Sequence, residues 1–186
     1  MRLTAKQLRK KQPTSEELAQ IKRNPIYIIL DNVLDTYNTG SIFRLADAVA
    51  AKKIFLCGET ETPPNPKILK ASVGTFRWVP WEYQKTALKA VEKLRKNIPQ
   101  IQILAVEQSK NSILYTKYKP KFPLALVVGN ETYGVSQQVL QTADYILEIP
   151  LFGVNKSLNV MVSLAIVLFQ ITQSLPKKPN LSSKDT

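Results

Sequence analysis

Residues 30–48 hold the first polar side chains whose spacing could serve chemistry. Asn38 is placed to cap a helix, and Gly40 two residues later lets another part of the backbone approach closely. Arg44 then follows about one turn into that helix. A guanidinium fixed near a helix start suits a phosphate or a ribose oxygen. An ordinary helix cap and a surface arginine would give the same pattern, so this segment alone decides nothing.

A second segment, residues 124–136, is an apolar strand that runs directly into Gly129, Glu131 and Gly134. It is neither a Walker A loop nor a Gly-x-Gly-x-x-Gly fingerprint, so nucleotide phosphates are not its expected ligand. A glycine at a strand end still allows backbone amides to meet a flat ring. Glu131 is expected to act as a hydrogen-bond acceptor or a structural anchor. A tight turn with a solvated glutamate is the simpler alternative.

The third segment, residues 145–167, contains a strand stopped by Pro150, a loop, and then an apolar helix. Ser157 is the expected N-cap of that helix. Asn159 precedes a helix that is apolar on nearly every side, so its amide needs a hydrogen-bond partner or a functional role.

These segments need a scaffold, and the hydrophobic pattern predicts one of alternating strands and helices. Short apolar runs predict strands at residues 26–30, 53–57, 77–81, 101–106, 124–128 and 145–149. Helical patterns occupy residues 40–51, 84–97, 136–142 and 158–173. This order predicts an α/β fold with a mostly parallel sheet flanked by helices. In such sheets ligands bind beyond the carboxyl ends of the strands, where all three polar segments begin.

The domain organisation is expected to be simple, because the chain has 186 residues. Residues 1–24 are predicted to form a basic N-terminal arm and a short helix, which Thr14 and Glu17 begin with a capping box. Residues 25–174 form the one domain, and residues 175–186 are expected to be a flexible tail.

Composition narrows the possible functions. The net charge of +12 favours a polyanion such as nucleic acid as partner, although a basic protein without such a partner fits the charge equally well. With no histidine and only Cys57, the chain has no residues for a Cys/His zinc site, a Ser-His-Asp triad or a disulfide. No metal is therefore expected. The polar N-terminus and the short apolar stretches predict a cytoplasmic protein without a membrane partner.

Together the three segments resemble the motifs of the SpoU (TrmH-type) class of SPOUT RNA methyltransferases. The first family motif matches Asn38, Gly40 and Arg44, and the second, Gly-x-Glu-x-x-Gly, matches Gly129, Glu131 and Gly134. The third, Ile-Pro-(Met/Leu) and then Ser-Leu-Asn-Val, matches residues 149–151 and 157–160. The resemblance covers residues 26–173 and departs at residues 49–51, where many members carry Phe-Gly.

The resemblance implies an α/β fold with a C-terminal deep trefoil knot, an exception to the rule that chains do not knot. It implies a homodimer that transfers a methyl group from S-adenosylmethionine to a ribose 2′-hydroxyl of tRNA or rRNA. By resemblance the catalytic residues are Arg44, Asn38, Glu131, Ser157 and Asn159. The residues expected to bind the cofactor are Val106, Glu107, Gly129, Asn130, Gly134, Ile149, Leu151, Ser157 and Leu158.

Lysines near these motifs are the candidates for RNA contact. The expected RNA-binding residues are Arg44, Lys67, Lys70, Lys110, Lys117 and Lys119. In the segment 109–121, Tyr115 and Tyr118 alternate with lysines, a composition suited to stacking on unpaired bases. An ordinary polar loop is the alternative there. Lys85, Lys89 and Lys93 form a helical stripe that is expected to be a solvated face.

Two other functions fit the same motifs. A non-catalytic RNA-binding or ribosome-assembly protein could use this scaffold, but the presence of Arg44, Glu131 and Asn159 argues against that reading. A SPOUT enzyme that methylates a base nitrogen is the other alternative, and the Asn-Gly-Arg motif favours the ribose over it. About 25 residues precede the first strand, which favours tRNA over a large ribosomal RNA as substrate.

Overall fold

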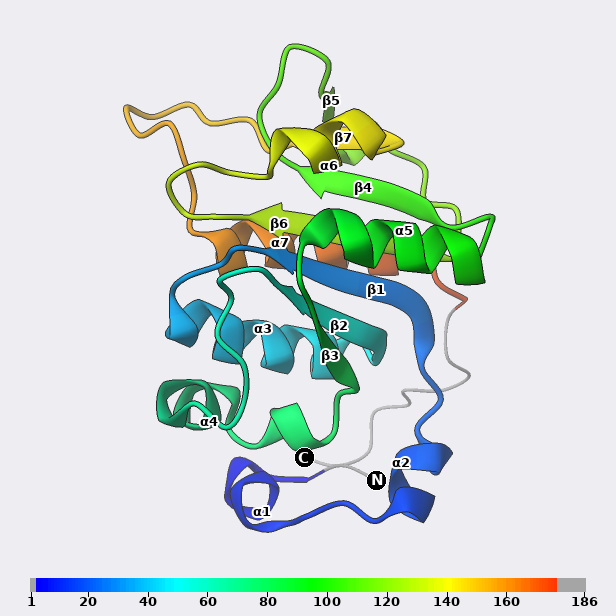
Figure 1. The fold of residues 1–186 in the computed structure, drawn as a ribbon, viewed down its shortest axis with the longest axis vertical. Helices are drawn as coiled ribbons and strands as arrows, with labels where there is room; N and C mark the ends of the chain where they lie inside the picture. Colours follow the sequence, from blue (N-terminus) through cyan, green and yellow to red (C-terminus); the bar gives the residue numbers. More distant parts are fainter. Residues whose placement is uncertain (1–2, 177–186) are drawn as a thin grey trace.

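The computed structural model describes residues 3–176 and contains one parallel sheet (Figure 1). Its seven strands lie in the order β3-β2-β1-β6-β4-β7-β5, and neighbouring strands pair in parallel. The strands are β1 (Asn24–Asp31), β2 (Ala51–Cys57), β3 (Trp81–Gln84), β4 (Gln102–Val106), β5 (Ile113–Leu114), β6 (Leu124–Gly129) and β7 (Tyr145–Glu148). The mostly parallel sheet expected from the sequence is therefore confirmed.

Helices cover both faces of this sheet. The helices are α1 (Ala5–Lys10), α2 (Ser15–Gln20), α3 (Thr36–Ala48), α4 (Pro66–Ser72), α5 (Ala87–Asn97), α6 (Gln137–Thr142) and α7 (Val160–Thr172). Apolar side chains of α3 and α7 pack on one face of the sheet and those of α5 and α6 on the other. Every residue of β6 is buried, as expected for a strand covered on both faces.

One predicted strand is wrong. Residues 77–81 were expected to be extended, but a 3₁₀ turn, η1 (Thr75–Arg77), occupies this region and β3 begins only at Trp81. Gly74, with φ of 93°, starts the turn. Trp78 and Val79 are buried in the turn rather than in a strand. A short apolar run predicts that its side chains are buried, but it does not determine whether the backbone forms a strand or a turn.

Helix boundaries also differ from the predicted ones, because other residues act as caps. Asp35 caps α3 through the backbone N–H of Tyr37, so the helix begins before Asn38, which lies inside its first turn. Asn159 caps α7 by accepting from the N–H groups of Met161 and Val162, so Ser157 is not the N-cap. Asn38 and Ser157 were both expected to cap, and neither does.

The proline-rich segment at residues 60–70 contains helix α4, which the sequence analysis did not predict. Asn65 accepts hydrogen bonds from the N–H groups of Lys67 and Ile68, and Pro66 stands at the first helical position. Proline is favourable there because its missing N–H would have no helical partner.

The N-terminal arm contains two short capped helices rather than one. The predicted capping box of Thr14 and Glu17 is confirmed at α2, and Thr4 with Gln7 forms a second capping box at α1. Residues 177–186 of the predicted tail lie outside the described residues. Among residues 3–176, no helix is long and apolar enough to cross a membrane.

Helix α3 is held close to α4 at Gly40. A Cβ at Gly40 would lie 2.6 Å from the Cβ of Ala71 and 2.8 Å from the carbonyl oxygen of Ile68. The close backbone approach expected of this glycine is therefore a contact between two helices. It fixes the position of the helix that carries Asn38 and Arg44.

Gly40→Ala should destabilise the protein by about 1–3 kcal/mol, because neither Ala71 nor the Ile68 carbonyl can move without shifting α4. Urea unfolding gives the free energy. Gly153→Ala is the matched control, since no atom lies within 4 Å of the added Cβ, and its effect should stay within about 0.5 kcal/mol. Equal effects at the two glycines would contradict this account of the helix contact.

Candidate functional site

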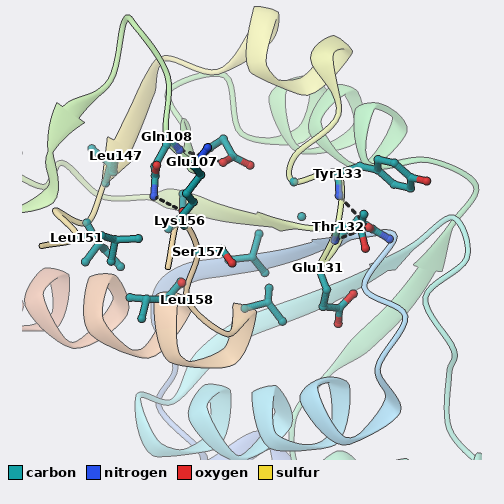
Figure 2. Close-up of a pocket in the computed structure, with 18 residues that line it drawn as sticks. Glu107, Gln108, Glu131, Thr132, Tyr133, Leu147, Leu151, Lys156, Ser157 and Leu158 are labelled. Carbon is teal, nitrogen blue, oxygen red and sulfur yellow. Dashed lines mark hydrogen bonds between the residues drawn. The ribbon is translucent and has the colours of Figure 1, made fainter. Parts of the chain in front are cut away.

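A cavity of about 260 Å³ lies at the carboxyl ends of β4, β6 and β7 (Figure 2). Its walls come from the three loops that follow these strands and from the start of α7. All nine residues expected from the resemblance to bind a cofactor line it, although they come from three separate parts of the sequence. The parallel topology explains this, because it brings the ends of these strands to one edge of the sheet.

The loop after β6 forms one wall of the cavity and is a tight backbone turn. The backbone groups of Asn130 and Gly134 exchange two hydrogen bonds of 3.0 and 2.9 Å. The Asn130 side chain accepts from the N–H groups of Thr132 and Tyr133 and donates to the carbonyl of Asn32. A Cβ at Gly129 would lie 2.1 Å from the carbonyl carbon of Gly134. Only glycine fits at this strand end.

Glu107 fixes the same turn from the neighbouring strand β4. Its carboxylate accepts hydrogen bonds of 2.9 Å from the N–H groups of Val135 and Gln108. Gly134 has φ of 69°, and a Cβ there would lie 2.0 Å from Oε2 of Glu107. The family resemblance assigned Glu107 to the cofactor site but did not indicate that it anchors the second glycine of the motif.

A chain of hydrogen bonds joins the three polar segments. Glu131 Oε1 accepts from Asn38 Nδ2 at 3.0 Å, and Asn38 Oδ1 accepts from Asn159 Nδ2, also at 3.0 Å. The Glu131 carboxylate further accepts from the N–H groups of Leu34 and Asp35 at 3.1 and 3.2 Å. Glu131 is thus an anchor for the loop that begins α3, and the Asn159 amide has a hydrogen-bond partner in Asn38, although Asn159 itself is exposed.

The electrostatics of Glu131 follow from these contacts. Partial burial alone would raise its pKa, but hydrogen bonds from Asn38 and from the N–H groups of Leu34 and Asp35 outweigh burial. The pKa of Glu131 is therefore lowered from its ordinary value, and the charged form is stabilised.

Arg44 lies in the middle of α3 rather than near its start, which corrects the expected position. It follows Gly40 by four residues, so the two share the helix face that meets α4. The side chain is exposed and forms no hydrogen bond or ion pair with any described residue. It does not line the cavity. An exposed guanidinium without a partner among the described residues is available to a ligand.

The loop between β7 and α7 closes another side of the cavity. Ser157 and Leu158 line it, and Gln108 donates a 3.0 Å hydrogen bond to the carbonyl of Lys156, as Figure 2 shows. Phe152 and Val154, in the middle of the loop, face outward and are 96% and 101% exposed.

The residues predicted to contact RNA differ in their exposure and in their partners within the protein. Lys67, Lys70, Lys110, Lys117 and Lys119 are all exposed. Tyr118, however, is buried and donates a hydrogen bond to Gln102, so the predicted base stacking is wrong at Tyr118. Tyr115 is only partly buried against the core, and base stacking there stays a prediction. Lys89 and Lys93 form ion pairs with Glu92 and Glu82, as a solvated face would.

Asp31 is a structural residue of the site that the sequence analysis did not single out. It is buried at the end of β1 and accepts a 2.9 Å hydrogen bond from the N–H of Ser136 beyond the glycine loop. An acidic residue ending an apolar strand was the signal that could have identified it. Among the residues that the structure describes, no three His, Cys, Asp or Glu side chains are grouped to hold a metal ion.

Comparisons of sequence and of structure both find similarity to RNA methyltransferases. The family model described as the SpoU rRNA Methylase family matches residues 25–169. A tRNA (guanosine(18)-2′-O)-methyltransferase of Aquifex aeolicus is 28% identical over 184 residues, which cover 96% of this chain and 85% of that protein. YacO of Bacillus subtilis, assigned to the TrmH family of tRNA/rRNA methyltransferases, is 27% identical over 79% of this chain. The chain spans 58% of the length of YacO.

A solved structure shares both the fold and part of the sequence. The AdoMet-bound rRNA methyltransferase of Sinorhizobium meliloti superposes with a TM-score of 0.75 at 27% identity. The match covers 91% of this chain and 61% of that one.

Glu131→Gln should lower stability at neutral pH, and the difference from the native protein should shrink as the pH falls below about 4.5. The folded pKa is lowered, so the stabilisation is present above the ordinary pKa and is lost on protonation. Urea unfolding of both proteins between pH 7 and about pH 3 measures this difference. Glu59→Gln is the control, because that exposed carboxylate accepts no hydrogen bond from a described residue. A Glu131→Gln deficit that does not change with pH would refute this role.

Proposed function

Because the chain belongs to the SpoU rRNA methylase family, we propose that it transfers a methyl group from S-adenosylmethionine to a ribose 2′-hydroxyl of tRNA or rRNA. One observation carries this proposal: the nine residues that the resemblance assigned to the cofactor line a single cavity. The hydrogen-bond chain from Glu131 through Asn38 to Asn159 then ties that cavity to the helix that bears Arg44.

The residues of the cavity fit this cofactor. Aliphatic side chains of Val106, Leu147, Ile149, Leu151 and Leu158 suit an adenine ring, and the glycine loop offers backbone groups at its edge. Glu107 and Glu131 give the cavity acidic partners for a cationic molecule, and S-adenosylmethionine has no phosphate that would require a basic cradle. When bound, it supplies a methyl group on a positively charged sulfur.

The chain must then orient a ribose and stabilise the oxygen as it loses its proton. Arg44 is the group that we assign to this task. A guanidinium stays protonated at ordinary pH, so it does not act as a general base. Its positive charge instead stabilises the developing alkoxide, and a phosphate of the RNA can accept the proton. Asn38 and Glu131 act as positioning residues, since they hold the first turn of α3.

Methyl transfer can be tested directly. The purified protein is incubated with S-adenosylmethionine labelled on its methyl group and with protein-free tRNA or rRNA, and the modified nucleosides are identified after digestion. We expect label in a 2′-O-methyl nucleoside. Label on a base would favour the base-methylating alternative. Failure to bind the methyl donor in calorimetry would favour a non-catalytic RNA-binding protein.

Arg44→Ala should reduce the rate of methyl transfer by at least about 100-fold while the cofactor still binds, because Arg44 lies outside the cavity. Arg44→Lys should retain an intermediate rate, since it keeps the charge but loses the planar fork. Single-turnover kinetics and calorimetry measure the two effects. Arg95→Ala, an exposed arginine on α5, is the matched control and should leave both unchanged. Full activity of Arg44→Ala would refute the assignment.

The proposal includes a homodimer. Helix α7 is apolar on most of its surface, yet Val162 and Phe169 remain 37% and 47% exposed. Leu158 at its start, and Phe152 and Val154 in the preceding loop, add further exposed apolar surface. A second copy of the chain packed on α7 would cover these side chains.

Light scattering at micromolar concentration should give about twice the chain mass of 21.0 kDa. Phe169→Glu should shift the protein to a monomer, because the dimer would bury an unpaired charge. Tyr83→Glu, which places the same charge on the exposed edge strand β3, should remain a dimer. A native monomer, or dissociation by both variants alike, would contradict this interface.

A further inference from the structure

Helix α1 presents only basic charge. It has six residues, with no buried side chain and no acidic residue in its first turn. Lys6, Arg9 and Lys10 are exposed, and no described residue forms an ion pair with them. Thr4 caps the helix through a capping box, so the fold of this short segment is specified by its own sequence.

The helix is nonetheless fixed to the domain, and its backbone makes the contacts. A Cβ at Gly74 would lie 2.2 Å from the carbonyl oxygen of Leu8, so α1 rests directly on the glycine that begins η1. Arg77 of η1 donates a hydrogen bond of 3.3 Å to the carbonyl of Arg9. After the helix, the ammonium of Lys11 lies 5.8 Å from the ring centroid of Trp78.

This mode of attachment leaves the charges of α1 free. An isolated helix of six residues is unstable in water, so its docking on η1 must offset the entropy of ordering it. The docking uses the carbonyls of Leu8 and Arg9. The backbone of α1 is thus fixed on the surface, and its side chains Lys6, Arg9 and Lys10 form no ion pair with a described residue.

The position of α1 relates it to the proposed site. Figure 1 shows α3, α4 and α1 in succession outward from the sheet. Gly74 follows α4 by two residues, and α4 packs on α3 at Gly40. Arg44 follows Gly40 on α3 by four residues, and α4 carries two exposed lysines, Lys67 and Lys70. The helices α3, α4 and α1 thus each carry exposed basic side chains.

We propose that α1 is a backbone clamp for the substrate RNA, in which Lys6, Arg9 and Lys10 bind phosphates that flank the nucleotide offered to Arg44. This inference rests on the proposed function for its substrate. Lysine and arginine side chains displace condensed counterions from phosphates and orient an RNA without reading its sequence. Gly74 is the residue that sets the position of the clamp.

The first test removes two charges without touching the docking contacts. Lys6→Ala/Lys10→Ala should weaken RNA binding about tenfold and make the plot of log affinity against log salt about two units less steep. Filter binding uses unfractionated bacterial tRNA and protein-free ribosomal RNA, each over a range of salt. Lys52→Ala/Lys96→Ala removes two exposed lysines from β2 and α5 and should change neither quantity by a comparable amount.

The second test moves the clamp and keeps its charges. Gly74→Ala places a Cβ against the Leu8 carbonyl and strains a backbone with φ of 93°, so α1 should detach. Trypsin should then cut after Lys6, Arg9 and Lys10 faster than in the native protein. RNA binding should fall as in the double lysine variant, and combining Gly74→Ala with that variant should add little, because both changes disable one element.

Cofactor binding separates this inference from the proposed function. All α1 and Gly74 variants should bind S-adenosylmethionine as the native protein does, with thermal unfolding as the check on folding. The clamp is refuted if Lys6→Ala/Lys10→Ala loses no more RNA affinity than the control pair, or if the native protein binds neither RNA. A native protein that binds RNA through α1 but does not bind the cofactor would instead refute the proposed function alone.

Discussion

The Glu131 carboxylate is the contact on which the arrangement of the site depends. It accepts hydrogen bonds from two backbone N–H groups before α3 and from the side chain of Asn38, which lies 93 positions away in the sequence. Asn38 in turn accepts from Asn159, which begins α7. Hydrogen bonds that converge on this one charged group therefore link three segments that are far apart in the sequence: the loop after β6, the start of α3 and the start of α7. Since hydrogen bonds to a charged acceptor are the stronger ones, this junction can hold loops that have little apolar contact.

The arrangement of the site also depends on glycines at which two backbone segments approach closely. Gly129 and Gly134 bring two parts of one loop together, and Gly40 does the same for two helices. At each of these points a side chain would force neighbouring atoms apart. The cavity wall formed by the glycine loop therefore presents backbone, while the walls from β4, β7 and α7 present aliphatic side chains. A flat ligand with polar edges matches that combination.

The strongly apolar strands were predictable because burial on both faces leaves an unbroken run of Ile, Leu and Val, as in β6. The run at residues 77–81 also contains large apolar side chains, but Gly74 and the burial of Trp78 and Val79 in a turn decided its backbone. Composition likewise suggested that Tyr118 could stack on RNA, whereas Gln102 provides it with a buried partner. Tertiary contacts of this kind leave no local signature in the sequence.

For the site, the sequence indicated which residues meet but not what each one does. Asn38 and Ser157 have the right type and place for N-caps, and Asp35 and Asn159 perform that task. Where two suitable capping residues lie a few positions apart, hydrogen bonds to residues distant in the sequence decide which of them caps the helix. Asn38 is freed from capping because Glu131 and Asn159 lie on either side of its amide.

The two side-chain hydrogen bonds that link Asn159, Asn38 and Glu131 run in one direction. Asn159 donates to Asn38 and Asn38 donates to Glu131, so each amide nitrogen faces an oxygen. Spontaneous deamidation of either asparagine would exchange that nitrogen for oxygen, with almost no change in volume, and oxygen would then oppose oxygen next to a carboxylate. Chemical ageing at either side chain would thus break the polar link between the starts of α3 and α7, while the apolar packing of the two helices still holds the fold.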